Sequence, residues 1–235
     1  MSDRDGSAGP SASVELHWIP LGAGANVVRV SGRLYESLSA WIGRRRPQNL
    51  FHSALTLSLP EGRYTIEQTP VPDLRGELRG VVAEGPVAIR CAGRLRHFRY
   101  EVRCWRDGTI PDLQCPGSHS QLVTSDAPTA RLILDTLATV PTPTWGRDEL
   151  RAGEMGNSNS VIAWVLTRSG IEARLIAPPA GGRAPGWAAG CVVARRDPRP
   201  SPREPTSRTH PRSPRPAEDT TEPARRPTTR GGTVR

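Results

Sequence analysis

Two short segments of the sequence contain the residue types that nucleophilic catalysis uses. One is His52, inside an apolar run that reads as a strand, and the other is the polar run 157–160 (NSNS). A serine hydroxyl is a weak nucleophile until a neighbouring base takes its proton. His52 could be that base for Ser160, and Glu67 could hold the imidazole in the required tautomer. The sequence therefore predicts Ser160, His52 and Glu67 as catalytic residues.

The expected position of Ser160 at the start of a helix suits this chemistry. A helix N-terminus carries partial positive charge and free N–H groups. Such donors stabilise an oxyanion by about 3 kcal/mol each. Three more residues are predicted to form the binding part of the site. They are Asn159 before Ser160, Gln68 next to Glu67, and Trp187 in a Gly- and Pro-rich turn.

Each of these residues also has a purely structural interpretation. Asn and Ser are preferred N-cap residues, so the 157–160 run is also consistent with a simple helix start. His52 is equally consistent with a hydrogen-bonded strand residue, and Glu67 with a solvated one. Trp187 is consistent with an aromatic anchor that packs on the core.

Hydrophobic periodicity predicts the elements that would position these side chains. Apolar alternation and Gly/Pro turn signals indicate several short strands with hairpin connections. Apolar residues that recur every three or four positions indicate separate helices, and Gly170 follows the end of the last one. Strands joined by hairpins with segregated helices are typical of an α+β fold. The expected strands are 14–19, 26–30, 50–59, 63–69, 81–83, 87–91, 98–105, 171–177 and 188–194, and the expected helices are 32–42, 129–140 and 160–169.

The order of these residues resembles the circularly permuted papain-like superfamily. That group includes NlpC-type hydrolases, lecithin retinol acyltransferase-like enzymes and desumoylating peptidases. In it a strand histidine comes first, a polar residue on the next strand orients it, and a cysteine opens a later helix, often after asparagine. His52, Glu67 or Gln68, and Ser160 after Asn159 match these positions. The resemblance implies a papain-like antiparallel sheet with a few packed helices, and it places Ser where the superfamily has the nucleophilic Cys.

Composition limits the other function classes. All 32 basic residues are Arg, and the net charge is +9. Arg without any Lys indicates a GC-rich coding bias more than a phosphate-binding surface, so we expect no nucleic-acid partner. The four cysteines form no C-x-x-C pair, so no metal site and no cofactor are predicted. No run of 18 apolar residues is present, which predicts no membrane span. Free thiols without a signal-peptide pattern favour the cytoplasm.

Composition also divides the chain into three parts. Residues 1–13 are Gly- and Ser-rich and read as a flexible leader, and residues 14–195 form the predicted single α+β domain. From 196 to 235 there are nine Pro and ten Arg, with Val234 the only branched aliphatic residue. Such a segment buries too little apolar surface to fold, so we expect a disordered tail, and its Pro-rich motifs could bind a protein partner.

The sequence therefore predicts a hydrolase or acyl-transfer enzyme that acts on an amide, ester or thioester. The expected partner is a small-molecule or peptide substrate. Two alternatives remain open. One is a catalytically silent papain-like scaffold that retains a pocket for binding, and the other is a basic adaptor protein that acts through its tail.

Overall fold

The computed structural model describes residues 12–21, 48–71 and 80–196, apart from the side chains of His97, Pro111 and Asp112. The chain divides into the units Met1–Arg199 and Pro200–Arg235, and every described residue belongs to the first. The strand expected over 26–30, the helix expected over 32–42 and the tail lie outside the described residues, except for Arg196.

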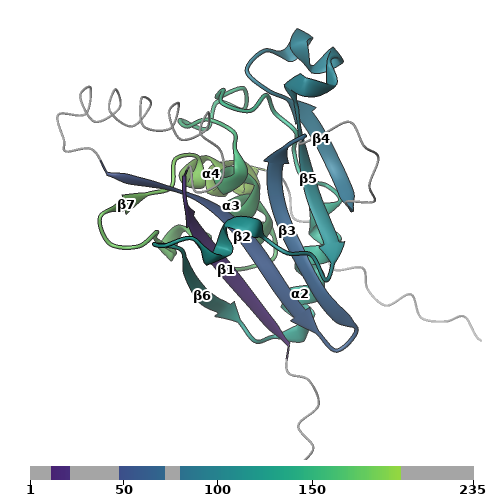
Figure 1. Cartoon of the computed structure of the whole chain (residues 1–235), viewed down its shortest axis with the longest axis vertical. Coiled ribbons are helices and arrows are strands. Elements are labelled where there is room, and N and C mark those ends of the chain that lie inside the picture. Colours follow the sequence, from purple (N-terminus) through teal and green to yellow (C-terminus); the bar gives the residue numbers. More distant parts are fainter. Residues whose placement is uncertain (1–11, 22–47, 72–79, 197–235) are drawn as a thin grey trace, which may run out of the picture. The chain divides into compact units, whose positions relative to one another are not determined.

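A seven-stranded sheet forms the centre of the described structure (Figure 1). Six strands run antiparallel in the order β4-β5-β3-β2-β1-β6, and the short β7 pairs with β2 in parallel. β2 and β3 form the predicted hairpin, with a turn at Pro60–Glu61. The strands are β1 (Ser13–Pro20), β2 (Asn49–Leu59), β3 (Gly62–Pro70), β4 (Val81–Pro86), β5 (Arg99–Arg106), β6 (His119–Thr124) and β7 (Gly182–Arg183).

Three α-helices lie on one face of this sheet: α2 (Ala127–Leu137), α3 (Ser158–Arg168) and α4 (Trp187–Arg196) (Figure 1). At the start of α2, the Asp126 side chain accepts a hydrogen bond from Thr129 N, at 2.8 Å. In α3 the residues from Val161 to Leu166 are all buried, which is expected of a helix packed on several sides.

α3 and α4 approach each other closely at Gly190. A Cβ built there would lie 2.2 Å from the backbone oxygen of Ser160 and 2.9 Å from the Ala163 side chain. No side chain larger than hydrogen fits at that distance, so Gly190 is required for this packing. Close contact between the two helices fixes α4 beside the start of α3.

Strand alternation gives the sheet two different faces. The face toward the helices is apolar, and from β1 and β2 it presents Val14, Leu16, Leu55 and Leu57, all fully buried. The opposite face, here called the polar face, carries polar and charged side chains from every neighbouring strand. Part of it is covered by a small cluster of Ile19, Ala54 and Ile110.

The structure confirms the α+β class and the antiparallel sheet with a few packed helices. The prediction of a strand is wrong for three segments. The 87–91 segment enters a 3-10 turn, η1 (Arg90–Arg94), the 171–177 segment contains η4 (Ala173–Leu175), and 188–194 lies within α4. β6 was not expected, because its sequence is polar. No helix among the described residues is long and apolar enough to cross a membrane.

Candidate functional site

Ser160 lies in the first turn of α3, where its hydroxyl group takes part in a capping box with Asn157. Asn157 is the N-cap, and its side chain accepts a hydrogen bond from Ser160 N at 3.1 Å. Ser160 Oγ accepts from Asn157 N at 2.8 Å and lies 2.7 Å from Asn157 O, to which it donates. Both contacts satisfy backbone groups at a helix end. The Ser160 proton is therefore directed at the chain's own carbonyl oxygen.

Asn159 joins the start of α3 to two other segments. Its side chain is 1 % exposed, and Nδ2 donates to Phe51 O and to Pro185 O, both at 2.9 Å. Asn157 Nδ2 donates to the same Pro185 oxygen at 2.8 Å. These contacts fix α3 on β2 and on the turn before α4. Asn159, predicted as a binding residue, therefore positions the helix.

His52 lies on the polar face, away from α3. On β2 it follows Phe51, which packs with the helices, and it pairs in register with Ile19 of β1. Because successive strand side chains point to opposite faces, His52 shares its face with Ala54 and Ile19. α3 packs against the other face of β2, so the sheet separates His52 from Ser160.

Glu67 is on the same face of the sheet as His52, and it forms an ion pair with an arginine. It pairs across the strands with Arg103 of β5, with 3.6 Å between Glu67 Oε1 and Arg103 Nη1. Arg103 also contacts Glu101, whose Oε2 accepts from Nε at 2.9 Å. Gln68 points to the helix side with Val102 opposite it. The structure therefore places Glu67 in a partly buried ion-pair cluster with Arg103 and Glu101, on the face of the sheet opposite Gln68.

Trp187, the third predicted binding residue, belongs to the core. It is 7 % exposed, and its ring lies 4.8 Å from that of Trp18. Its indole Nε1 donates to Ala173 O at 2.9 Å. This residue therefore anchors the start of α4, in agreement with the structural interpretation of its sequence.

The structure brings a different serine and histidine together, on the polar face. His17 of β1 is 2 % exposed, with Nδ1 2.7 Å from Ser120 Oγ and Nε2 2.8 Å from Thr56 Oγ1. Ser120 lies on β6 directly opposite His17, and its side chain is exposed. Nothing in the linear sequence relates these three positions, because the contact depends on the β1–β6 pairing.

Burial lowers the pKa of His17 below its usual value. The loss of solvation is the largest cause, the charge of Glu15 acts in the opposite direction, and Arg63 lowers the pKa further. His17 is therefore neutral at pH 7, with one ring nitrogen donating and the other accepting. Either hydroxyl neighbour can supply the complementary role.

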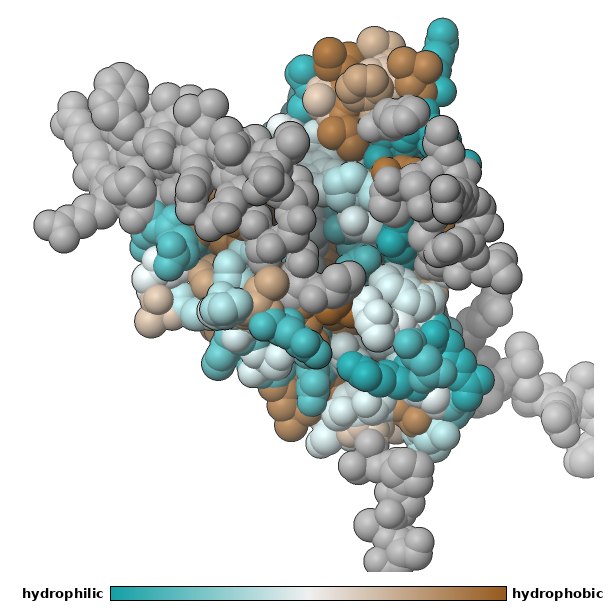
Figure 2. Space-filling view, in the orientation of Figure 1, coloured by the Kyte–Doolittle hydropathy of each residue, from teal (hydrophilic) through white to brown (hydrophobic). Residues whose placement is uncertain are grey.

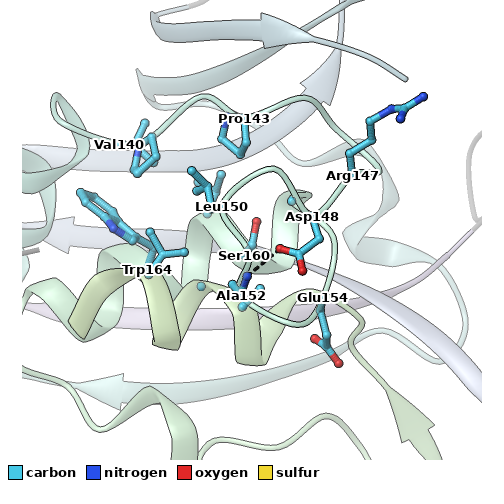
Figure 3. Close-up of a pocket in the computed structure, with 15 residues that line it drawn as sticks. Val140, Pro143, Arg147, Asp148, Leu150, Ala152, Glu154, Ser160 and Trp164 are labelled. Atoms are coloured by element: carbon cyan, nitrogen blue, oxygen red, sulfur yellow. Dashed lines mark hydrogen bonds between the residues drawn. The ribbon is translucent and has the colours of Figure 1, made fainter. Parts of the chain in front are cut away.

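A small cavity, open to solvent on one side, lies next to the start of α3 (Figure 3). The loop between α2 and α3 covers it, and α3 and α4 form its floor. The lining is mainly apolar and includes Val140, Leu150, Trp164 and Val193, together with Ser160. Trp164 is 3 % exposed, and its indole Nε1 meets no hydrogen-bond acceptor in the part of the chain that the structure describes.

Acidic side chains give the loop over this cavity a fixed conformation. Asp148 accepts from Ala152 N at 2.6 Å, the contact drawn in Figure 3, and also from Gly153 N at 2.9 Å. Glu149 accepts from Thr144 N at 2.8 Å, and the hydrogen bonds from Thr144 lower its pKa. Glu154 accepts from the backbone N–H of Gly186 at 2.7 Å. These carboxylates are used as internal braces.

Within residues 12–21, 48–71 and 80–196, no group of three or more His, Cys, Asp or Glu side chains could hold a metal ion. The described cysteines are free thiols, and burial raises the pKa of Cys104 to about 11.

Comparison of the chain with models of protein families, with curated protein sequences and with solved structures gave no match.

Proposed function

We propose that this chain is a catalytically silent scaffold of the papain-like kind that binds an apolar group in the cavity beside α3. The observation that carries the proposal is the capping box, which holds the Ser160 hydroxyl on Asn157 while His52 lies across the sheet. Without a base in contact, a serine hydroxyl is a poor nucleophile. What supports the scaffold assignment is the position of α3, whose first turn is bonded to β2 through Asn159.

The cavity provides the binding part of the proposal. Its lining is largely apolar with a few polar groups, which is the composition expected of a site for an apolar group. Trp164 lines the cavity, and its Nε1 is a buried donor that a carbonyl group on the ligand would satisfy once the indole turns toward the cavity. An aromatic or aliphatic amino-acid side chain with its adjoining peptide group has this combination of features. The proposed ligand is therefore a peptide segment or an amide of similar size.

Two measurements on the full chain test this function. Titration with N-acetyl-phenylalaninamide should shift the Trp164 indole N–H resonance, which a Trp164→Phe variant identifies. Ala152→Leu narrows the cavity and should weaken the response, whereas Ala138→Leu, at an exposed position after α2, should leave it unchanged. A resonance that does not move at saturating amide would contradict the proposed binding site.

The second measurement addresses catalysis. A fluorophosphonate probe should form no adduct at Ser160. A Ser160→Cys thiol should alkylate no faster than a model thiol, with a rate that is the same in a His52→Ala background. Rapid alkylation that requires His52 would show a working nucleophile–base pair and overturn the silent assignment.

One contact favours a second candidate function, hydrolysis or acyl transfer through Ser120. His17 Nδ1 lies 2.7 Å from Ser120 Oγ and could take its proton as Oγ attacks a carbonyl carbon. The same probe experiment decides between the two functions. A fluorophosphonate adduct on Ser120 that is lost in His17→Ala would establish this second function, and absence of the adduct would support the silent scaffold.

A further inference from the structure

Residues 87–98 form a loop that projects from the end of the sheet and exposes large apolar side chains. Ile89 is 52 % exposed, Leu95 60 % and Phe98 46 %. Val81 and Val82 on the adjacent β4 are each 40 % exposed. Figure 2 shows hydrophobic atoms gathered where the chain extends beyond β4 and β5. Contiguous exposed apolar groups of this kind mark interaction surfaces.

The same loop carries positive charge without any acidic residue. Arg90, Arg94 and Arg96 are exposed, and no Asp or Glu occurs between Pro86 and Arg99. Arg90 lies close enough to Glu149 to lower the pKa of that carboxyl group, so part of its charge is balanced. Arg94 and Arg96 extend the basic character to the tip. The apolar side chains are therefore bordered by guanidinium groups.

Backbone contacts hold this loop in place at its base. Val87 N donates to Phe98 O at 2.8 Å, which closes the loop, and Ala88 N donates to Trp145 O at 3.1 Å. Arg147 Nε also donates to Ala88 O. Two consecutive 3-10 turns, η1 and η2 (Arg96–Phe98), form the rest. The apolar side chains are thus presented by an ordered backbone.

We infer that the 87–98 loop docks on an anionic lipid surface, with Ile89, Leu95 and Phe98 entering the headgroup region and Arg94 and Arg96 binding lipid phosphates. Charge complementarity decides the occupant. Basic side chains near an anionic bilayer each strengthen binding about fivefold, and apolar side chains among them add affinity by leaving water. Ile89 and Leu95 are aliphatic and give no stacking surface for nucleic-acid bases, and Phe98 is the one exposed aromatic ring described in the loop, so the lipid surface fits the set of side chains better.

The chain contains a matched pair of dipeptides for the test. Arg94-Leu95 ends η1, and Arg174-Leu175 ends η4, where Leu175 is 75 % exposed. Both pairs place an arginine and an exposed leucine at a 3-10 turn. The double variants Arg94→Gln/Leu95→Ser and Arg174→Gln/Leu175→Ser therefore make the same chemical change at two sites.

Full-length protein is sedimented with vesicles of phosphatidylcholine and phosphatidylglycerol at a ratio of 7:3. The loop variant should bind at least tenfold more weakly than the unaltered chain. The vesicle affinity of the control variant should stay within twofold of the unaltered chain, because Arg174 and Leu175 lie outside the 87–98 loop. The 196–235 segment and its arginines are the same in the two variants. Vesicles of phosphatidylcholine alone should bind the unaltered chain at least tenfold more weakly.

Cys91 provides a second readout because it is exposed within η1. A bimane label on Cys91, in a Cys115→Ser background, should shift its emission to the blue on the anionic vesicles. A label at Leu175→Cys, in a Cys91→Ser/Cys115→Ser background, should not shift. Equal vesicle binding by both double variants would overturn the inference. It would also be overturned if the loop variant lost affinity for a single-stranded RNA oligomer while its vesicle binding stayed unchanged.

Discussion

The helix-covered face and the polar face of the sheet are stabilised by different kinds of interaction. On the helix side, Leu16, Leu55 and Ile162 are fully buried among other apolar side chains, so burial of apolar surface is the stabilising term. On the polar face, buried positions are occupied by His17, Glu101 and Arg103. His17 contacts Thr56 and Arg103 contacts Glu67 on neighbouring strands, and Glu101 pairs with Arg103 on its own strand. Their contribution depends on specific hydrogen bonds and ion pairs.

This difference determines what each face can do. The helix layer contains the cavity, where the 140–156 loop closes over α3 and α4, so this layer suits binding of an apolar group. On the polar face, an imidazole contacts two hydroxyl groups, and a guanidinium group contacts two carboxylates. The residues of the predicted catalytic site are divided between the two, with Ser160 on the helix layer and His52 and Glu67 on the polar face.

The largest expected effect comes from truncating a side chain in the helix layer. Trp164→Ala should lower the free energy of unfolding by about 3–5 kcal/mol, because the removed indole leaves a cavity between α3 and its neighbours. Chemical denaturation measures it. Leu175→Ala, at a 75 % exposed position, should change stability by less than about 0.5 kcal/mol. A Trp164→Ala variant as stable as the unaltered protein would contradict apolar burial as the main term on this side.

Removing the central cation of the polar face should have the next largest effect. Arg103→Gln removes the cation that pairs with the buried Glu101 and the partly buried Glu67, which should cost about 3 kcal/mol. In the double variant Arg103→Gln/Glu101→Gln one of the two negative charges is absent. Its destabilisation should therefore be smaller than the sum of the two single changes by about 1–3 kcal/mol. Strict additivity in the denaturation measurements would show that this ion pair does not stabilise the polar face.

A smaller effect is expected at His17, where stability should depend on pH. Folding lowers the pKa of His17 from 6.5, so the unfolded chain binds the proton more tightly. The stabilisation is fully present above pH 6.5 and is lost as the pH falls through the lowered pKa. His17→Leu should lower the free energy of unfolding by about 1–2 kcal/mol at pH 7.5, because Thr56 loses its partner. It should also make the melting temperature less dependent on pH below pH 6.5.

Thr56→Val is the control for this measurement, because it removes the same hydrogen bond and keeps the titratable ring. The melting temperature of Thr56→Val should still decrease as the pH falls below 6.5. If Thr56→Val and His17→Leu reduced this decrease equally, the pH dependence would have to come from the hydrogen bond and not from protonation of the imidazole.

The sequence predicted those elements whose residue pattern determines their own structure. β2 and β3 alternate between the faces and meet at a turn, and α3 combines an apolar run with an Asn N-cap and Gly170 after its end. α4 was predicted as a strand because a run of Ala, Gly, Cys and Val has no period that separates strand from helix. β6 exposes polar side chains, so it lacks the apolar alternation that identifies a strand.

The side-chain neighbours around the predicted site could not be derived from the sequence. The capping box at Ser160 is a local pattern, and the N-cap interpretation anticipated it. Which face His52 occupies depends on the register of β2, and a shift by one residue would reverse it. The contact of His17 with Ser120 requires the pairing of two strands 103 residues apart. These facts follow from tertiary packing, which no local spacing encodes.

The smallest expected effect is an energetic coupling close to zero between Ser160 and His52. Ser160→Ala removes the hydroxyl that completes the capping box and should cost about 1 kcal/mol. His52→Ala acts on the other side of the sheet, so the double variant should equal the sum of the single changes within about 0.5 kcal/mol. Denaturation of the four proteins at pH 7.5 gives this coupling directly. A coupling above 1 kcal/mol would mean that the two side chains interact despite the sheet between them. Such a coupling would restore the hypothesis of a catalytic pair at the start of α3.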